Sequence, residues 1–134
     1  MLFILKKRSI GTVFVTLCKS KIHKARVTAC EPDYEGSLLI DTELLKESGI
    51  LPYEKILVSN ASNGERFETY AIPGTAGKKQ IMLNGPAAKL GKPGDHLTIM
   101  AFGIFNEKES FNFKPKIIVL NDKNEIIQKK GSLA

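Results

Sequence analysis

Cysteine and histidine are scarce in this sequence. Its 134 residues include only Cys18, Cys30, His23 and His96. Two cysteines exclude a disulfide-rich scaffold and a four-cysteine zinc site. The two histidines lie far apart in the chain, and no cysteine or carboxylate stands at a metal-ligand spacing to either. We therefore expect no metal centre, and the low cysteine content favours a reducing compartment.

Long hydrophobic runs are also absent. The basic Lys6-Lys7-Arg8 is followed by a mostly apolar stretch, residues 10–18, and a signal peptide has the same order of basic and apolar parts. Gly11 and two threonines interrupt this apolar stretch. A membrane span needs about twenty apolar residues, and no small-x-small cleavage site follows this run. Residues 12–17 are rich in β-branched side chains and fit a strand equally well. We expect a cytoplasmic protein without a membrane partner.

Acidic residues are missing from the first thirty positions. Those positions hold seven lysines and arginines, whereas residues 31–134 carry 13 basic and 14 acidic side chains, so the net charge of +6 arises in the leading segment. A nucleic-acid-binding domain more often spreads its positive charge over one face. Solvated lysines are the simpler explanation, and we expect no nucleic-acid partner. A basic β-barrel binding module, with nucleic acid as one ligand, is the alternative.

The size and composition fit one folded domain. The chain is 43% apolar and 25% charged, which excludes a disordered chain, and its length suits a single core. We expect one domain over residues 1–134, with residues 1–12 as an N-terminal extension. The motifs GxSxG, GxGxxG and the P-loop are absent, so hydrolase elbows and nucleotide loops are unsupported.

Short strands separated by turn signals dominate the pattern. One helix is predicted after Asp41, a good N-cap, and before Gly49, which suits the C-terminal cap. Asn63-Gly64 predicts a hairpin turn, and residues 86–90 predict one helical turn. The segments read as strands or short apolar stretches are 12–18, 21–28, 37–40, 55–59, 66–72, 80–83, 96–105, 117–120 and 125–128. This pattern predicts a mainly β fold, a small closed barrel with one or two short helices.

The most informative segment is Tyr34-Glu35-Gly36-Ser37. A Gly-Ser pair alone usually marks a loop before a strand, so its surroundings decide. Lys21-Ile22-His23 precedes it, and three segments follow it: 63–67, Thr69-Tyr70 and 81–88. Their order and spacing resemble the pyruvoyl-dependent L-aspartate α-decarboxylases, which make β-alanine for the biosynthesis of pantothenate, the coenzyme A precursor. The resemblance runs from about residue 17 to about residue 119.

The resemblance implies a fold and an assembly. Family members are small double-psi β-barrels, and Gly94-Asp95 before an apolar strand fits that barrel. They form homotetramers with active sites between subunits. L-Aspartate is the implied substrate, with β-alanine and CO2 as products, and a maturation factor is a further candidate partner.

The resemblance also implies that the chain cuts itself between Gly36 and Ser37. The Oγ of Ser37 would attack the carbonyl of Gly36 to form an ester, and β-elimination would release Gly36 as a carboxylate. Hydrolysis of the resulting dehydroalanine leaves a pyruvoyl group in place of Ser37. The products would be a β chain of residues 1–36 and an α chain of residues 37–134. The pyruvoyl group would be the cofactor, without metal or pyridoxal phosphate.

In this family the pyruvoyl ketone forms a Schiff base with aspartate and delocalises the electrons that decarboxylation leaves behind. A phenol carries its proton at neutral pH and can reprotonate the former α-carbon, while a guanidinium offers two parallel donors to a carboxylate. The implied roles are the catalytic acid for Tyr70, carboxylate binding for Arg66 and Lys21, support of self-cleavage and substrate binding for Thr69, and lining of the site for Asn84, Gly85 and Tyr34.

Two points stay open at this stage. Period-two alternation puts Arg66 and Tyr70 on one face of their strand and Thr69 on the other, so both faces function only if the strand bulges or if the faces serve different subunits. The sequence also departs from the family pattern. Pro86 stands where alanine is common, Ser59 stands where an aromatic residue can occur, and the N-terminal extension is longer than usual.

Overall fold

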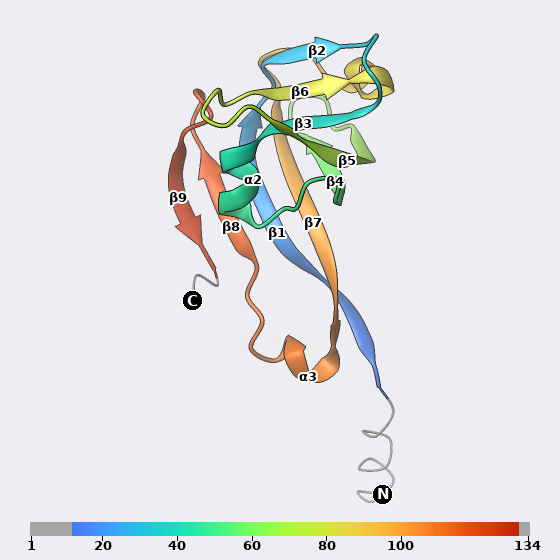
Figure 1. Ribbon diagram of the computed structural model, residues 1–134, viewed down its shortest axis with the longest axis vertical. Helices are drawn as coiled ribbons and strands as arrows, with labels where there is room; N and C mark the ends of the chain where they lie inside the picture. The colour runs from blue at the N-terminus through green and yellow to red at the C-terminus, as the bar shows by residue number, and fades with distance from the viewer. Residues whose placement is uncertain (1–11, 132–134) are drawn as a thin grey trace, which may run out of the picture.

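The computed structural model describes residues 12–131, and most of the predicted extension, residues 1–11, lies outside this range. The described chain is mainly β (Figure 1). Its strands are β1 Phe14–Arg26, β2 Ala29–Glu31, β3 Ser37–Asp41, β4 Lys55–Asn60, β5 Arg66–Gly74, β6 Ile81–Asn84, β7 His96–Asn106, β8 Lys116–Leu120 and β9 Ile126–Lys130. Its helices are α2 Thr42–Ser48, the 3-10 helix η1 Gly85–Leu90 and α3 Glu107–Ser110.

The strands form one mixed sheet in the order β2-β6-β3-β5-β4-β7-β1-β8-β9. The pairs β1–β8, β2–β6 and β3–β5 are parallel, and the others are antiparallel. Hydrogen bonds also join the connection between β1 and β2 to the start of β6: the Thr28 N–H donates to Ile81 O (2.8 Å), and the Ile81 N–H donates to Thr28 Oγ1 (3.0 Å). These bonds curl the sheet back on itself, as expected for a small double-psi β-barrel.

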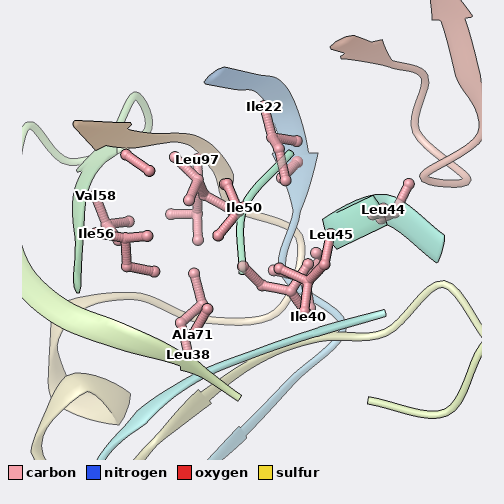
Figure 2. Packing of buried hydrophobic residues seen from close by; sticks show 14 of the residues in the cluster. Ile22, Leu38, Ile40, Leu44, Leu45, Ile50, Ile56, Val58, Ala71 and Leu97 are labelled. Carbon is pink, nitrogen blue, oxygen red and sulfur yellow. The ribbon is translucent and has the colours of Figure 1, made fainter. Parts of the chain in front are cut away.

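A single apolar core fills this curved sheet. Side chains from β1, β3, β4, β5 and β7 converge on one interior, with Leu44 and Leu45 of α2 at its side (Figure 2). Along β4 the buried residues are Ile56, Val58 and Asn60, which is the alternation expected of a strand with one face in the core. The largest fully buried side chains are Ile22, Leu38, Ile40, Leu45, Ile50, Ile56, Ile81, Leu83, Leu97, Ile99, Ile118 and Leu120.

The predicted helix α2 is present with its predicted caps. The Asp41 side chain accepts a hydrogen bond from the Glu43 N–H at 2.8 Å. Gly49 ends the helix in the left-handed conformation (φ 77°), and its N–H donates to Leu45 O at 2.9 Å. The hairpin at Asn63-Gly64 is also confirmed, because β4 and β5 pair antiparallel around it.

The structure differs from the predicted elements in three places. The short strand β2 was not expected. Residues 12–18 and 21–28 were expected as separate strands, but most of both belong to the single strand β1. Register shifts between Cys18 and Ser20 and between Ile22 and Ala25 let β1 bend without ending. The short α3 was not expected; its signal is the capping box that Asn106 and Glu109 form.

Candidate active site

The Gly36–Ser37 bond lies where the loop after β2 enters β3. Ser37 is the first residue of β3, pairs with Asn84 of β6 in antiparallel register, and is 1% exposed. Its φ of 138° lies in a region that residues other than glycine rarely adopt. Such a conformation costs of the order of 1–3 kcal/mol and persists only where the surrounding structure enforces it. The backbone is therefore strained at the bond that the sequence analysis singled out.

Two buried polar atoms at this point have no hydrogen-bond partner among the described residues. They are the hydroxyl Oγ of Ser37 and the amide Oδ1 of Asn84. A buried polar atom without a partner costs roughly 1–3 kcal/mol, so two of them on paired residues are unusual for a merely structural position. Among the described residues, no hydrogen bond therefore competes for the Ser37 hydroxyl. This environment fits the conversion of Ser37 into a reactive group.

Gly85 holds the segment before the Gly36–Ser37 bond in place. Gly85 has φ 63°, and a Cβ there would lie 2.8 Å from Gly36 Cα, 2.9 Å from Gly36 N and 2.9 Å from Tyr34 O. Only glycine permits so close an approach of two backbone segments. Tyr34 and Asn84 also line one open hollow, whose other lining residues are Glu31, Asp33, Glu35, Leu39 and Ile72.

Tyr70 and Thr69 lie on the neighbouring strand, close to this bond. β5 lies beside β3 (Figure 1) and runs parallel to it. Leu38 stands opposite Ala71 in this pair of strands. Leu38 follows Ser37 and Ala71 follows Tyr70, so the backbone of Tyr70 lies next to that of Ser37, with Thr69 one residue before it. Tyr70 is 39% exposed, whereas Thr69 is half-buried. The alternation of exposed and more buried residues along β5 confirms that these two side chains point to opposite faces.

Arg66 and Lys21 lie elsewhere in the chain. Arg66 starts β5, four residues before Tyr70 and so about 13 Å away along an extended strand. Lys21 lies in β1 between Met100 of β7 and Ile117 of β8, and β1 is four strands from β3 in the sheet order. Within residues 12–131, neither side chain forms a hydrogen bond or ion pair with the cleavage segment.

One contact near Arg66 was not predicted. Its Nη1 donates to the Oγ of Ser59, its partner across the β4–β5 hairpin, at 2.7 Å. The sequence marked Ser59 only as a departure from the family pattern. Near Lys21, the Nδ1 of His23 lies 3.4 Å from Thr98 Oγ1. Burial and the neighbouring lysines lower the pKa of His23, so this imidazole is neutral at pH 7.

Neither a metal cluster nor a membrane-spanning helix is found in the described part of the chain. Within residues 12–131, no group of three or more His, Cys, Asp or Glu side chains could hold a metal ion. No helix of the same range is long and apolar enough to cross a membrane.

Comparison with known proteins agrees with this geometry. The family model for aspartate decarboxylase matches residues 13–127. The chain is 48% identical over 112 residues to an aspartate 1-decarboxylase of Chlorobium chlorochromatii, covering 84% of this chain and 87% of the relative. It is 50% identical over 110 residues to that of Desulfotalea psychrophila (82% and 92%) and 47% identical over 119 residues to that of Acetivibrio thermocellus (89% and 94%). The chain belongs to the aspartate decarboxylase family.

Proposed function

We propose that this protein is a self-processing aspartate 1-decarboxylase, which removes the α-carboxylate of L-aspartate to give β-alanine and CO2 for pantothenate biosynthesis. The observation that carries the proposal is Ser37, whose backbone is strained and whose buried hydroxyl, opposite Asn84, has no hydrogen-bond partner within residues 12–131. Family membership supports the reaction and the substrate. The two cysteines are free thiols, which agrees with a cytoplasmic protein.

Maturation starts from the uncut chain. The Oγ of Ser37 attacks the carbonyl carbon of Gly36, and the peptide nitrogen leaves as an amine, so an ester replaces the amide. Gly36 has no Cβ to obstruct the attack, and breaking the peptide bond relieves the strain at Ser37. In this proposal the Asn84 amide, which pairs with Ser37 across the two strands, accepts from the Ser37 hydroxyl as the attack begins, and Thr69 supports cleavage by donating to the Gly36 carbonyl. β-Elimination then frees the Gly36 carboxylate, and hydrolysis with loss of ammonia leaves the pyruvoyl group.

The pyruvoyl group supplies an electrophile for the substrate amine and takes up the electrons released as CO2 leaves. The side chains bind the substrate and donate the proton. Arg66 binds a substrate carboxylate through parallel N–H donors, and Lys21 adds a second positive charge. Tyr70 donates the proton to the former α-carbon. Asn84, Gly85 and Tyr34 line the site beside the new α-chain terminus. Neither metal nor pyridoxal phosphate enters this scheme, so activity should survive EDTA and purification without added cofactor.

A complete site needs a second subunit in this proposal. Within one chain, Asn84 pairs with Ser37 and Gly85 lies against Gly36, whereas Arg66 and Tyr70 share the face of β5 opposite to Thr69, and Lys21 lies on β1, four strands from β3 in the sheet order. Each subunit would lend Arg66, Tyr70 and Lys21 to its neighbour, as in a homotetramer with sites between subunits. Exposed apolar side chains supply surface for such contacts. They lie at the start of β1, on β7 and next to α3, and include Val13, Phe14, Phe102, Ile104 and Phe111.

The intact mass of denatured protein tests the proposal. Wild type should give two chains, residues 1–36 and 37–134, the larger without a free α-amine. Ser37→Ala should remain one chain without decarboxylase activity, while Ser62→Ala in the β4–β5 turn should be cut like wild type. Incubation with and without host-cell extract separates unaided cleavage from cleavage by a maturation factor. A single intact wild-type chain under both conditions would favour the alternative, a basic binding module with an inert Gly-Ser pair.

A further inference from the structure

Ser59 and Arg66 face each other where β4 and β5 meet the hairpin turn. They form a register pair of the two antiparallel strands, and the Nη1 of Arg66 donates to the Oγ of Ser59 at 2.7 Å. Within residues 12–131, the Arg66 side chain makes no other hydrogen bond. The orientation of this exposed guanidinium therefore depends on one serine hydroxyl.

The backbone beneath this pair is well fixed. The Asn60 N–H donates to Glu65 O and the Gly64 N–H donates to Asn60 O, both at 2.8 Å. The Asn60 side chain, which is buried, donates to Asp95 Oδ2 at 2.9 Å. The turn is thus anchored to the loop before β7. The backbone of Arg66 is therefore fixed, and only its long side chain can change conformation. Arginine loses considerable rotamer freedom when it is held in one orientation.

The contact also leaves the charge of Arg66 available. Glu68 lies on the same exposed face of β5, but its Oε2 is paired with Lys55 Nζ at 2.7 Å. Arg66 itself forms no ion pair within residues 12–131. A hydroxyl is neutral, so it orients the guanidinium without neutralising it. Four of the five guanidinium N–H donors remain, which is enough for a bidentate carboxylate contact.

We propose that Ser59 is a positioning residue: its hydroxyl holds the Arg66 guanidinium in the orientation that binds a carboxylate of aspartate, and it thereby determines substrate affinity. This inference rests on the proposed function, in which Arg66 binds the substrate. Because Ser59 already holds the Arg66 side chain in one orientation, less side-chain conformational entropy is lost when the substrate binds.

Steady-state kinetics on fully processed enzyme tests the role. Ser59→Ala should raise the KM for L-aspartate about threefold to tenfold, the loss expected for one hydrogen bond, and leave kcat within about twofold. Ser59→Thr keeps the hydroxyl and should restore the wild-type KM. Ser62→Ala is the matched control, because its hydroxyl contacts the His96 N–H and not Arg66. In an Arg66→Lys background, Ser59→Ala should have no further effect on KM.

A second measurement does not depend on activity. In the uncut Ser37→Ala chain, the guanidinium N–H signals of Arg66 in the NMR spectrum should be separate, because a bound Nη1 rotates slowly. Ser59→Ala should merge them, and Arg66→Lys identifies them by removing them. Unchanged Arg66 signals in Ser59→Ala, or an unchanged KM in an active enzyme, would overturn the role of Ser59. A processed wild type that does not consume aspartate would contradict the proposed function and this inference together.

Discussion

At Gly85, even the methyl group of alanine would collide with the backbone of the cleavage segment. The residue adopts a positive φ and lies under the backbone of Tyr34 and Gly36. Gly64, in the β4–β5 turn, adopts a similar φ of 78° but has nothing within 4 Å of the place where a Cβ would stand. The two glycines thus share a positive φ, which glycine adopts without strain, and differ in what a side chain would contact.

Gly85→Ala should therefore slow self-cleavage at least about tenfold, because the new Cβ pushes the Gly36 backbone away from the Ser37 hydroxyl. Each alanine at positive φ should also cost roughly 1–2 kcal/mol of folding stability. The mass of denatured protein sampled over time after synthesis measures the rate. Gly64→Ala is the control: it puts alanine at a similar φ without a clash, so it should lose only roughly 1–2 kcal/mol of folding stability and be cut normally. Equal cleavage rates in both variants would contradict the steric role of Gly85.

At the scale of elements, one buried carboxylate joins the turn after β4 to the loop before β7. Asp95 accepts from Asn60 Nδ2 at 2.9 Å and from the Lys92 N–H at 3.0 Å, and Lys92 Nζ lies 3.6 Å away. Burial alone would raise the pKa of Asp95, but these hydrogen bonds and the lysine charge outweigh it and lower the pKa below its ordinary value.

The sign of the pH dependence follows from this lowered pKa. The unfolded chain takes up the proton first, so the ionised Asp95 stabilises the fold above its unfolded pKa, near 4. That stabilisation is lost as pH falls through the lower folded value. Asp95→Asn should cost about 1.5–3 kcal/mol at pH 7, and the difference from the parent should shrink below about pH 4. Denaturant unfolding of the uncut Ser37→Ala chain, as parent, measures this. A difference that grows on acidification would contradict the assignment.

Elements governed by local chemistry were predictable, and those governed by pairing were not. The caps of α2 at Asp41 and Gly49 and the Asn63-Gly64 turn depend on neighbouring residues, so the sequence displays them. The parallel pairing of β1 with β8 depends on the whole fold. So does the role of Asn124, whose buried side chain bonds Arg26 and Lys79.

The candidate site divides in the same way. The Gly36–Ser37 bond and Asn84 stand in segments that resemble the family, so the resemblance pointed to them. The contact of Ser59 with Arg66 could not be predicted, because it requires the register of β4 and β5. Nor could the sequence show that Lys21 and Ser37 lie on strands far apart in the sheet, since only the strand order reveals it.

At the scale of the whole molecule, the separation of Arg66 from Ser37 predicts complementation between defective subunits. Ser37→Ala should not mature, and Arg66→Ala should be cut normally but turn over aspartate about tenfold to a hundredfold more slowly. Co-expressed in equal amounts, they should form mixed tetramers in which about one quarter of the sites combine an intact Ser37 with a neighbour's intact Arg66. Decarboxylase activity should rise accordingly.

The control pairs Ser37→Ala with Asn84→Ala. Asn84 is the register partner of Ser37 in the same chain, so no mixed site contains both residues intact, and activity should stay at the level of the separate variants. Restoration in this pair, or none in the first, would show that the site is divided between subunits differently.

The place of β1 between β7 and β8 has a consequence for how the mature protein comes apart. Once the bond after Gly36 is cut, β1 and β2 belong to a separate polypeptide that only noncovalent contacts retain. Folding of the uncut chain is unimolecular, whereas reassembly of the cut chains is bimolecular and depends on protein concentration. After denaturation and dilution, Ser37→Ala should regain its fold and the mature protein should not. In the proposed maturation, the fold therefore forms once, before the cut, and the separated chains should not readily refold.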